Sequence, residues 1–264
     1  MLELCEIVKV FNRGTVDEKL ALDRLSLTIP DGQFVTVIGG NGAGKSTMLN
    51  IVSGSKTPDS GRVILDGQDI TRLPEHKRAK YLGRVWQDPM QGTAAGMQIE
   101  ENLALAYRRG KRRTLAPGIR KSERAMYRER LADLGLGLED RLTARVGTLS
   151  GGQRQALTLL MATLSRPGLL LLDEHTAALD PKTAERVMTL TEKIVCEASL
   201  TTLMITHNMK DAIRYGDRLI MLHAGRVILD ISGEQKTALT VERLLRLFNE
   251  VSGEEFAADR AVLS

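Results

Sequence analysis

The chain has 264 residues, a formal net charge of +4 at pH 7 and 42% hydrophobic residues. This length suits one large domain or a domain with an inserted subdomain, and the apolar fraction is sufficient for a substantial core. The charge excess is small and mostly scattered, so it does not point to a protein that binds nucleic acid.

Neither cysteine usage nor hydropathy points to secretion or to a membrane span. Cys5 and Cys196 match no metal-ligand or redox spacing, so we expect ordinary thiols in a reducing compartment such as the cytoplasm. Apolar runs such as Leu169–Leu172 are far shorter than a bilayer requires. The first residues lack the basic and apolar regions of a secretion signal, and no leader is expected.

The first forty residues predict antiparallel strands. LELCEIVKVF (2–11) and LSLTI (25–29) are short apolar runs between polar turns, and Pro30-Asp31-Gly32 forms a turn before FVTVIG (34–39). The third run is continuously apolar, as expected of a strand that is covered on both faces. A glycine-rich loop follows it directly.

The next elements alternate between helix and strand. A helix is predicted from Lys45 to Val52, stopped by Gly54, and RVILDGQDI (62–70) predicts a strand with a turn. Residues 88–165 have helical periodicity and no convincing strand, which favours a mostly helical insert.

Strand-like runs then return, with a helix from about 181 to 198 that Asp180 caps and Pro181 opens. These later strands are expected at 169–173, 203–206, 218–222 and 226–231. Strands that alternate with helices predict parallel crossovers and therefore an α/β core. We expect the core at 1–87 and 166–252, a helical subdomain at 88–165, a last helix at 241–250 and a short tail at 253–264.

The segment GGNGAGKST (39–47) fits the phosphate-loop pattern G-x-x-x-x-G-K-[ST] between a buried strand and a helix. Its glycines allow backbone angles at which successive N–H groups converge on a phosphate chain. Lys45 would place a positive charge beside the β- and γ-phosphates, and Ser46 would supply a hydroxyl to Mg²⁺. The predicted nucleotide contacts are Gly39, Gly40, Asn41, Gly42, Ala43, Gly44, Lys45, Ser46 and Thr47.

Two carboxylates end the leucine-rich strand at 169–173. Asp173 is the last strand residue and Glu174 follows it, as in nucleotide hydrolases that hold Mg²⁺ with an aspartate at a strand end. We expect Asp173 to hold Mg²⁺ through its water shell and Glu174 to act as the general base on the attacking water. A solvated turn is the alternative for an isolated acidic pair.

The segment LSGGQ (149–153) precedes a predicted helix. Ser150 and Gln153 have the spacing of a capping box, so their helix should begin with its amides available to an anion. Taken alone, the segment fits either a well-capped helix or an anion site.

Together, these motifs and their order resemble the ABC ATPase family, from about Leu2 to Ser232. The resemblance implies a P-loop NTPase core of mainly parallel sheet, with an N-terminal antiparallel β subdomain and an inserted helical subdomain. It also implies a head-to-tail homodimer with MgATP between the subunits. In that dimer Ser150, Gly151, Gly152 and Gln153 of one copy contact the γ-phosphate held by the other.

Further positions match the family individually. Phe11 resembles the aromatic that stacks on adenine, and Gln87 the glutamine that contacts Mg²⁺ and water. His207 resembles the switch histidine that contacts the γ-phosphate. The segment AALD, which ends at Asp180, resembles the loop that spans the dimer interface. The alternatives are a buried strand Phe, a solvated amide and a surface histidine. The proposed catalytic set is Glu174, His207, Gln87 and Lys45, and the metal set is Ser46, Gln87 and Asp173.

The resemblance implies a subunit that hydrolyses ATP to power a separate permease at the cytoplasmic face of the cell membrane. A chain of this kind most resembles bacterial importer subunits, which implies an extracytoplasmic solute-binding protein as a further partner. The segment DEHTAALDP (173–181) further resembles subunits of tryptophan and tyrosine uptake systems. A soluble ABC protein acting on ribosomes or DNA is the alternative, but neither an internal repeat nor sustained heptads support it.

Three features are left open by the sequence. His175 stands where the family usually has proline; hydrolysis should survive, and no role for the imidazole follows. The segment 87–107 resembles the surface on which a permease docks, but Met90, Met97 and Leu103 could equally be core. The basic segment at 108–130, which includes Arg112 and Arg113, is either a solvated face or a surface near anionic lipid.

Overall fold

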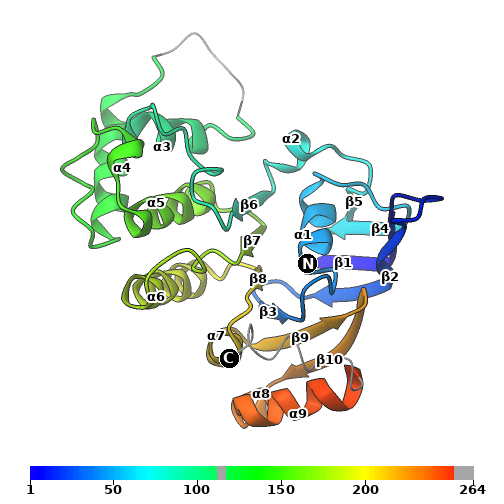
Figure 1. The fold of residues 1–264 in the computed structure, drawn as a ribbon. Coiled ribbons are helices and arrows are strands. Elements are labelled where there is room, and N and C mark those ends of the chain that lie inside the picture. The colour runs from blue at the N-terminus through cyan, green and yellow to red at the C-terminus, as the bar shows by residue number, and fades with distance from the viewer. Residues whose placement is uncertain (112–116, 253–264) are drawn as a thin grey trace. The chain divides into compact units, whose positions relative to one another are not determined.

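The computed structural model describes residues 1–111 and 117–252 (Figure 1). The chain divides into two compact units: unit 1 comprises residues 1–78 and the chain from 199 onward, and unit 2 comprises residues 79–198. Arg112, Arg113 and the expected tail at 253–264 lie outside the described residues.

Unit 1 begins with an antiparallel sheet. Its strands are β1 (Leu2–Phe11), β2 (Lys19–Ile29), β4 (Ser60–Leu65) and β5 (Gln68–Asp69), in the order β2-β1-β4-β5 (Figure 1). The register of β1 against β2 shifts between Leu4 and Ile7, where Glu6 has a φ of +49°. Such irregularities bend a strand and increase its twist. The predicted antiparallel start of the chain is confirmed.

A second set of paired strands in unit 1 is mainly parallel. Its strands are β3 (Phe34–Ile38), β8 (Thr202–Ile205), β9 (Arg218–His223) and β10 (Arg226–Ser232). Both β8 and β9 run parallel to β3, and β10 closes the edge antiparallel to β9. All residues of β3 are buried, which confirms a strand covered on both faces.

The helices of unit 1 are α1 (Lys45–Ser53), α2 (Glu75–Arg78), α7 (Met209–Arg214), α8 (Glu234–Thr237) and α9 (Val241–Ser252). Arg78 in α2 is buried, and its guanidinium donates to the carbonyl oxygens of Ile51 and Val52 at the end of α1. From α9, Leu244 and Phe248 join an apolar cluster with residues of α7 and β9. The amphipathic last helix is therefore part of a core.

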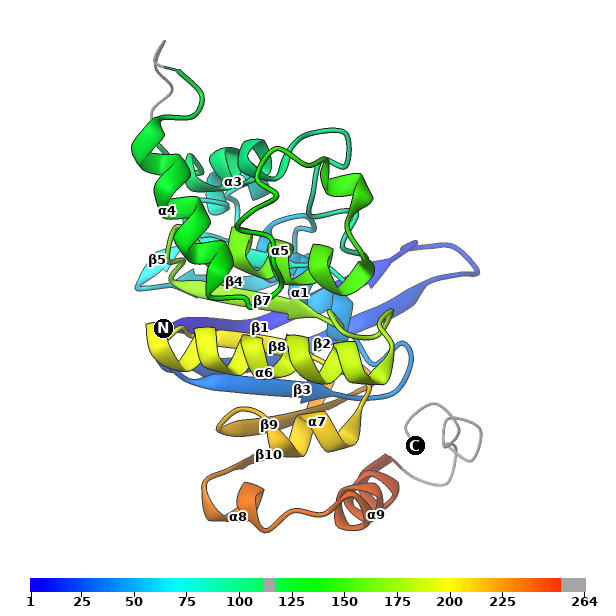
Figure 2. The same ribbon diagram turned by 90° about the vertical axis from the view of Figure 1, so that its left-hand side faces the viewer.

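In its described residues, 79–111 and 117–198, unit 2 contains two parallel strands and four longer helices. These elements are β6 (Leu82–Val85), β7 (Leu169–Asp173), α3 (Ile99–Tyr107), α4 (Lys121–Ala132), α5 (Gly151–Thr163) and α6 (Pro181–Ala198). Helices α3, α4 and α5 enclose one apolar cluster that includes Leu103, Tyr127 and Leu157. Helices α5 and α6 lie side by side (Figure 2).

The predicted fold class is confirmed: the chain has a mixed α/β core with an antiparallel sheet and mostly parallel strands. The sequence analysis missed β6, because four residues that include Gly83 and Arg84 carry little strand signal. None of the helices in residues 1–111 and 117–252 combines the length and the apolar composition that a membrane span requires. The expected domain boundaries stay a prediction.

Candidate functional site

The phosphate-loop segment lies between β3 and α1, as the sequence predicts. Gly44 precedes α1 with a φ of +102°, and no described side chain caps the first turn of this helix. The first amides of an α-helix have no partner inside the helix, and a helix start that follows a glycine-rich loop can bind an anion. At Gly39 a Cβ would lie 2.3 Å from the carbonyl oxygen of Leu222, so only glycine fits beside the end of β9.

The Lys45 side chain is held by the loop itself. Its Nζ donates to the carbonyl oxygens of Gly39, at 2.6 Å, and Gly40, at 3.1 Å, and the residue is 8% exposed. A buried ammonium needs such acceptors, because desolvation of an unpaired charge is costly. The loop thus holds one positive charge beside the uncapped start of α1, which is an environment suited to an anion.

A second lysine, which the sequence analysis missed, lies at the same loop. Lys19 is opposite Phe11 in the β1–β2 register, and its Nζ lies 2.9 Å from the position that a Cβ on Gly42 would occupy. Phe11 is partly buried, and its ring centroid lies 5.7 Å from Nζ of Lys9. Lys19 therefore links the predicted adenine-stacking residue to the predicted phosphate loop. Only the strand pairing reveals this, since Lys19 belongs to no motif.

His207 follows β8, as expected, and is partly buried. The next residue, Asn208, caps α7 through Oδ1, which accepts from the backbone N–H groups of Lys210 and Asp211. Burial raises the pKa of Asp211, and the charges of Arg214 and His207 oppose this rise. The turn after β8 is thus held by a helix cap and keeps His207 within electrostatic reach of a half-buried carboxyl.

In unit 2, the acidic pair lies at the end of β7. Arg84 Nη2 donates to Oδ2 of Asp173 at 3.0 Å, and the two side chains are 10% and 16% exposed. The strand register explains this pair: Arg84 is opposite Leu171, and Asp173 lies two residues further on the same face. The guanidinium also lies 3.5 Å from the Trp86 ring centroid. The sequence analysis missed Arg84 because it missed β6.

Glu174 has a φ of +43°, which is uncommon for a residue with a side chain. Its carbonyl oxygen accepts from the N–H of Ala177 at 3.0 Å, so the chain turns directly after β7. His175 is 2% exposed, and its Nε2 lies 3.1 Å from Oγ1 of Thr191 in α6. Burial lowers the pKa of His175 to about 4, so the imidazole is neutral at physiological pH.

The capping box predicted for LSGGQ is confirmed. Ser150 Oγ accepts from the N–H of Gln153 at 3.3 Å, and Oε1 of Gln153 accepts from the N–H of Ser150 at 3.2 Å. The next helix start is capped in a similar way, since Oδ1 of Asp180 accepts from the N–H of Thr183. Hydrogen bonds from Thr183 lower the pKa of Asp180. Gln87 is exposed beyond the end of β6.

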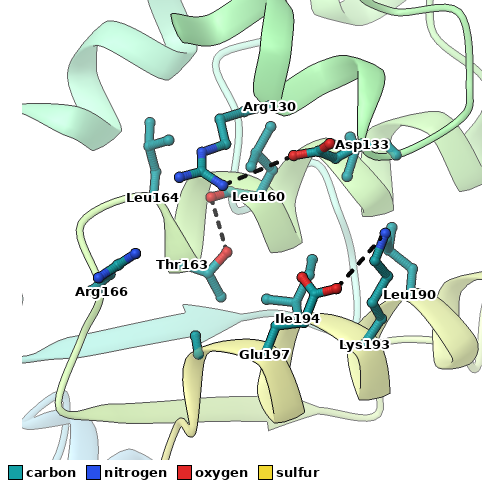
Figure 3. A pocket seen from close by; sticks show the side chains of 12 residues that line it. Arg130, Asp133, Leu160, Thr163, Leu164, Arg166, Leu190, Lys193, Ile194 and Glu197 are labelled. Carbon is teal, nitrogen blue, oxygen red and sulfur yellow. Dashed lines mark hydrogen bonds and ion pairs between the residues drawn. The ribbon is translucent and has the colours of Figure 1, made fainter.

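Two hollows lie within unit 2. One, of about 430 Å³, is lined by Ser150, Gly152 and Gln153 together with side chains of α6. The other, of about 270 Å³, has leucines of α5 and α6 in its walls and the ion pairs Arg130–Asp133 and Lys193–Glu197 at its rim (Figure 3). This second hollow contains none of the predicted site residues.

Some residues of the expected docking segment are buried and others are exposed. Leu103 is fully buried in the apolar cluster of unit 2, so for this residue the alternative of a core position holds. Met90 is 44% exposed and accepts a contact from Arg154 at its sulfur, and Leu105 is 59% exposed on α3. Met97 is partly exposed, so among the large apolar side chains of this segment Met90 and Leu105 are the most accessible to a partner.

Several arginines of the basic segment have partners within unit 2. Arg108 forms an ion pair with Glu123, and Arg124 forms one with Glu100, which is 5% exposed. Arg109 donates to the carbonyl oxygen of Leu82. Ion pairs thus account for Arg108 and Arg124, and a solvated face or a surface near anionic lipid stays a prediction for the segment as a whole.

Comparisons with known proteins agree with this fold. A family model described as ABC transporter matches residues 22–177. A tyrosine transport ATP-binding protein of Clostridioides difficile is 48% identical over 248 residues, which cover 94% of this chain and 98% of that protein. A methionine import ATP-binding protein of Corynebacterium efficiens is 35% identical over 86% of this chain, but the match spans only 61% of that longer protein.

Solved structures show the same relationship. The dimeric structure of a bacterial ABC transporter cassette has a TM-score of 0.74 and 32% identity, and the match covers 88% of this chain and 98% of that one. A dimeric, post-hydrolysis ATP-binding cassette bound to ADP and Pi has a TM-score of 0.73 and 30% identity over the same shares of the two chains. This chain therefore belongs to the ABC transporter family. Within that family it is an ATP-binding subunit and an ATPase; the alternative of a ribosome- or DNA-acting protein finds no support among these relatives.

Proposed function

We propose that this chain is the ATP-driven motor of a bacterial amino-acid importer, working as a homodimer that binds two MgATP and energises a separate permease. The observation that carries the proposal is the buried Lys45 ammonium, which the phosphate loop of unit 1 holds at the start of α1, where the charge and the helix start would together bind an anion. Phe11 and Lys19 would extend that surface toward the base of the nucleotide.

The oxygen donors proposed for Mg²⁺ suit this ion. Ser46 offers an exposed hydroxyl, Asp173 a carboxylate and Gln87 an exposed amide, and Mg²⁺ prefers oxygen ligands together with phosphate oxygens and water. When bound, Mg²⁺ would neutralise charge on the phosphates. Asp173 already accepts from Arg84, so its carboxylate is held in one direction.

In the hydrolysis step, Glu174 would accept a proton from the attacking water. Gln87 and His207 would orient that water and the γ-phosphate. Lys45 would stabilise the charge that develops on the phosphoryl oxygens, an electrostatic contribution that usually dominates phosphoryl transfer.

The signature residues would act on the nucleotide of the other copy. The capping box leaves the start of α5 well defined, and a helix start presents N–H groups that can close the open side of a γ-phosphate. Asp180, which caps α6, would lie in the loop that spans the dimer interface. Two solved structures of one relative are dimers, and one of these is bound to ADP and Pi, which supports this arrangement.

The proposed partners follow from the relatives. The tyrosine transport and methionine import named for two relatives support amino-acid import. We propose a permease and an extracytoplasmic solute-binding protein as the other components of the system. A relative from Clostridium perfringens is part of a multi-subunit ABC transporter complex. Met90 and Leu105 would dock the permease and thereby hold the chain at the cytoplasmic face of the membrane.

We further propose the domain division at 1–87 and 166–252 for the ATPase core and at 88–165 for the helical subdomain. Most residues of the apolar cluster enclosed by α3, α4 and α5 lie between Ile99 and Met161, which supports a subdomain with a core of its own.

The test is ATP-dependent dimerisation of Glu174→Gln. This variant keeps the phosphate loop but lacks the base, so hydrolysis should fall by about 10²-fold or more while ATP stays bound. Light scattering should show a dimer with MgATP and a monomer without it. Adding Lys45→Ala should abolish the dimer, because the phosphates lose their main charge partner. Normal steady-state hydrolysis by Glu174→Gln would remove Glu174 from its role.

A further inference from the structure

The turn after β7 has one anchor in the protein interior. Between residues 174 and 180, His175 is the only buried residue, whereas Glu174 is partly exposed and Ala177 is exposed. The ring of His175 is in contact with α6, where Thr191 is fully buried. Any movement of this turn must therefore move a buried side chain.

The direction of the hydrogen bond between these residues follows from the other bond that Thr191 makes. Its hydroxyl hydrogen is donated to the carbonyl oxygen of Val187 at 2.8 Å, so Oγ1 can only accept from the imidazole. His175 therefore carries its hydrogen on Nε2. A hydroxyl that both donates and accepts in a buried site restricts the ring to one orientation.

The backbone next to this anchor is in an unfavourable conformation. Glu174 has a φ of +43°, and a non-glycine residue is strained in this region and persists there only when its surroundings hold it. The N–H of Ala177 holds the carbonyl oxygen of Glu174, and the His175–Thr191 bond holds the residue that follows. Both contacts oppose relaxation of the backbone of Glu174.

We propose that His175 is a positioning residue for hydrolysis: its Nε2–H···Oγ1 bond to Thr191 ties the turn to α6 and keeps the Glu174 side chain directed for proton abstraction. This inference rests on the proposed role of Glu174 as the base. It assigns a function to a buried imidazole that does not itself reach substrate. A misdirected base slows the chemical step and leaves nucleotide affinity intact, because the phosphate loop is unaffected.

The decisive variant is Thr191→Val, which removes the acceptor and nearly preserves side-chain volume. In the full chain, kcat for ATP should fall about tenfold, with KM and ATP affinity within about twofold of the parent. Thr191→Ser keeps the oxygen and should retain kcat. On the other side of the bond, His175→Gln keeps a donor and should retain more activity than His175→Ala. Thermal unfolding of every variant identifies the temperature range in which all are folded.

Two outcomes would overturn the inference. One is a Thr191→Val variant with unchanged kcat; the other is an equal loss in Thr191→Ser, which would mean that the hydrogen bond is not responsible. A double-mutant cycle that combines Thr191→Val with Glu174→Gln tests whether Thr191 acts through the base. Thr191→Val should cause no further loss in that background, and a further tenfold loss there would contradict the inference.

The same cycle separates the two proposals. Full activity of Glu174→Gln alone would remove Glu174 as the base in the proposed hydrolysis step, and the positioning role that depends on this base would fall with it. Impaired Glu174→Gln together with fully active Thr191→Val contradicts only the positioning role.

Discussion

A Cβ atom on Gly152 would lie 2.1 Å from Cγ2 of Thr183. Gly152 is in the first turn of α5 and Thr183 is in the first turn of α6, so the two helix starts pack together without room for a side chain. The second signature glycine is thus required by packing inside one copy of the chain. The start of α5 cannot shift without disturbing the start of α6, which Asp180 caps.

Gly152→Ala should therefore reduce the free energy of unfolding by about 1–3 kcal/mol, as overpacked sites usually do. Thr183→Ser in the same chain removes the clashing methyl group and should restore most of the loss. Gly151→Ala is the matched control, because its Cβ would lie an ordinary 3.4 Å from Leu179. Urea denaturation of the parent, the two single glycine variants and the double variant measures the free energy of unfolding. Equal losses of stability in Gly151→Ala and Gly152→Ala would refute the packing explanation.

Lys19→Ala should weaken ATP binding roughly threefold to tenfold, since it removes one exposed charge from the phosphate loop. Lys9→Ala should have less effect, because its ammonium lies 3.0 Å from Asp59 and is already paired. Lys45→Ala should be far more damaging than either. Calorimetric titration with ATP at two salt concentrations measures the affinities. The Lys19 effect should shrink at high salt; an ATP affinity unaffected by Lys19→Ala at low salt would exclude a phosphate contact.

Arg84→Met should cost about 2 kcal/mol of stability without nucleotide, because Asp173 keeps a largely buried charge and loses its partner. MgATP should recover part of this loss, since the proposed Mg²⁺ supplies another positive charge near Asp173 and bound ligand favours the folded state. Arg226→Met breaks the exposed pair with Asp23 and should cost little. Thermal unfolding with and without MgATP provides the comparison. Equal losses of stability in Arg84→Met and Arg226→Met would contradict the view that Arg84 neutralises a largely buried charge on Asp173.

Glu123→Gln should destabilise the protein at neutral pH but not in acid. Burial raises the pKa of Glu123, yet hydrogen bonds from the backbone N–H of Arg120 and from Arg108 outweigh it, so the pKa is lowered overall. A carboxyl with a lowered pKa stabilises the fold above its unfolded-state pKa and loses this contribution as pH falls through the folded-state value. Denaturation at a series of pH values should show the difference vanish in acid. Glu129→Gln, on the exposed face of α4, should show no such trend.

Strands and motifs whose signal lies within a few consecutive residues were predictable. The continuous apolar runs of β3 and β7, the glycines before α1 and the capping box of α5 are local patterns, and the structure has each of these elements where the sequence places it. Strand β6 was missed because its short run contains Gly83 and Arg84. With β6 missed, the partner of Asp173 could not be found.

The sequence by itself determined the class of chemistry, because a phosphate cradle, a strand-end acidic pair and a capped helix start are each built from neighbouring residues whose backbone geometry is local. Only the tertiary structure decided which side chains support that chemistry. Thr191 lies 16 residues from His175, and Arg84 lies 89 residues from Asp173. Packing of helices and strands brings such pairs together, and no spacing along the chain encodes a contact of that kind.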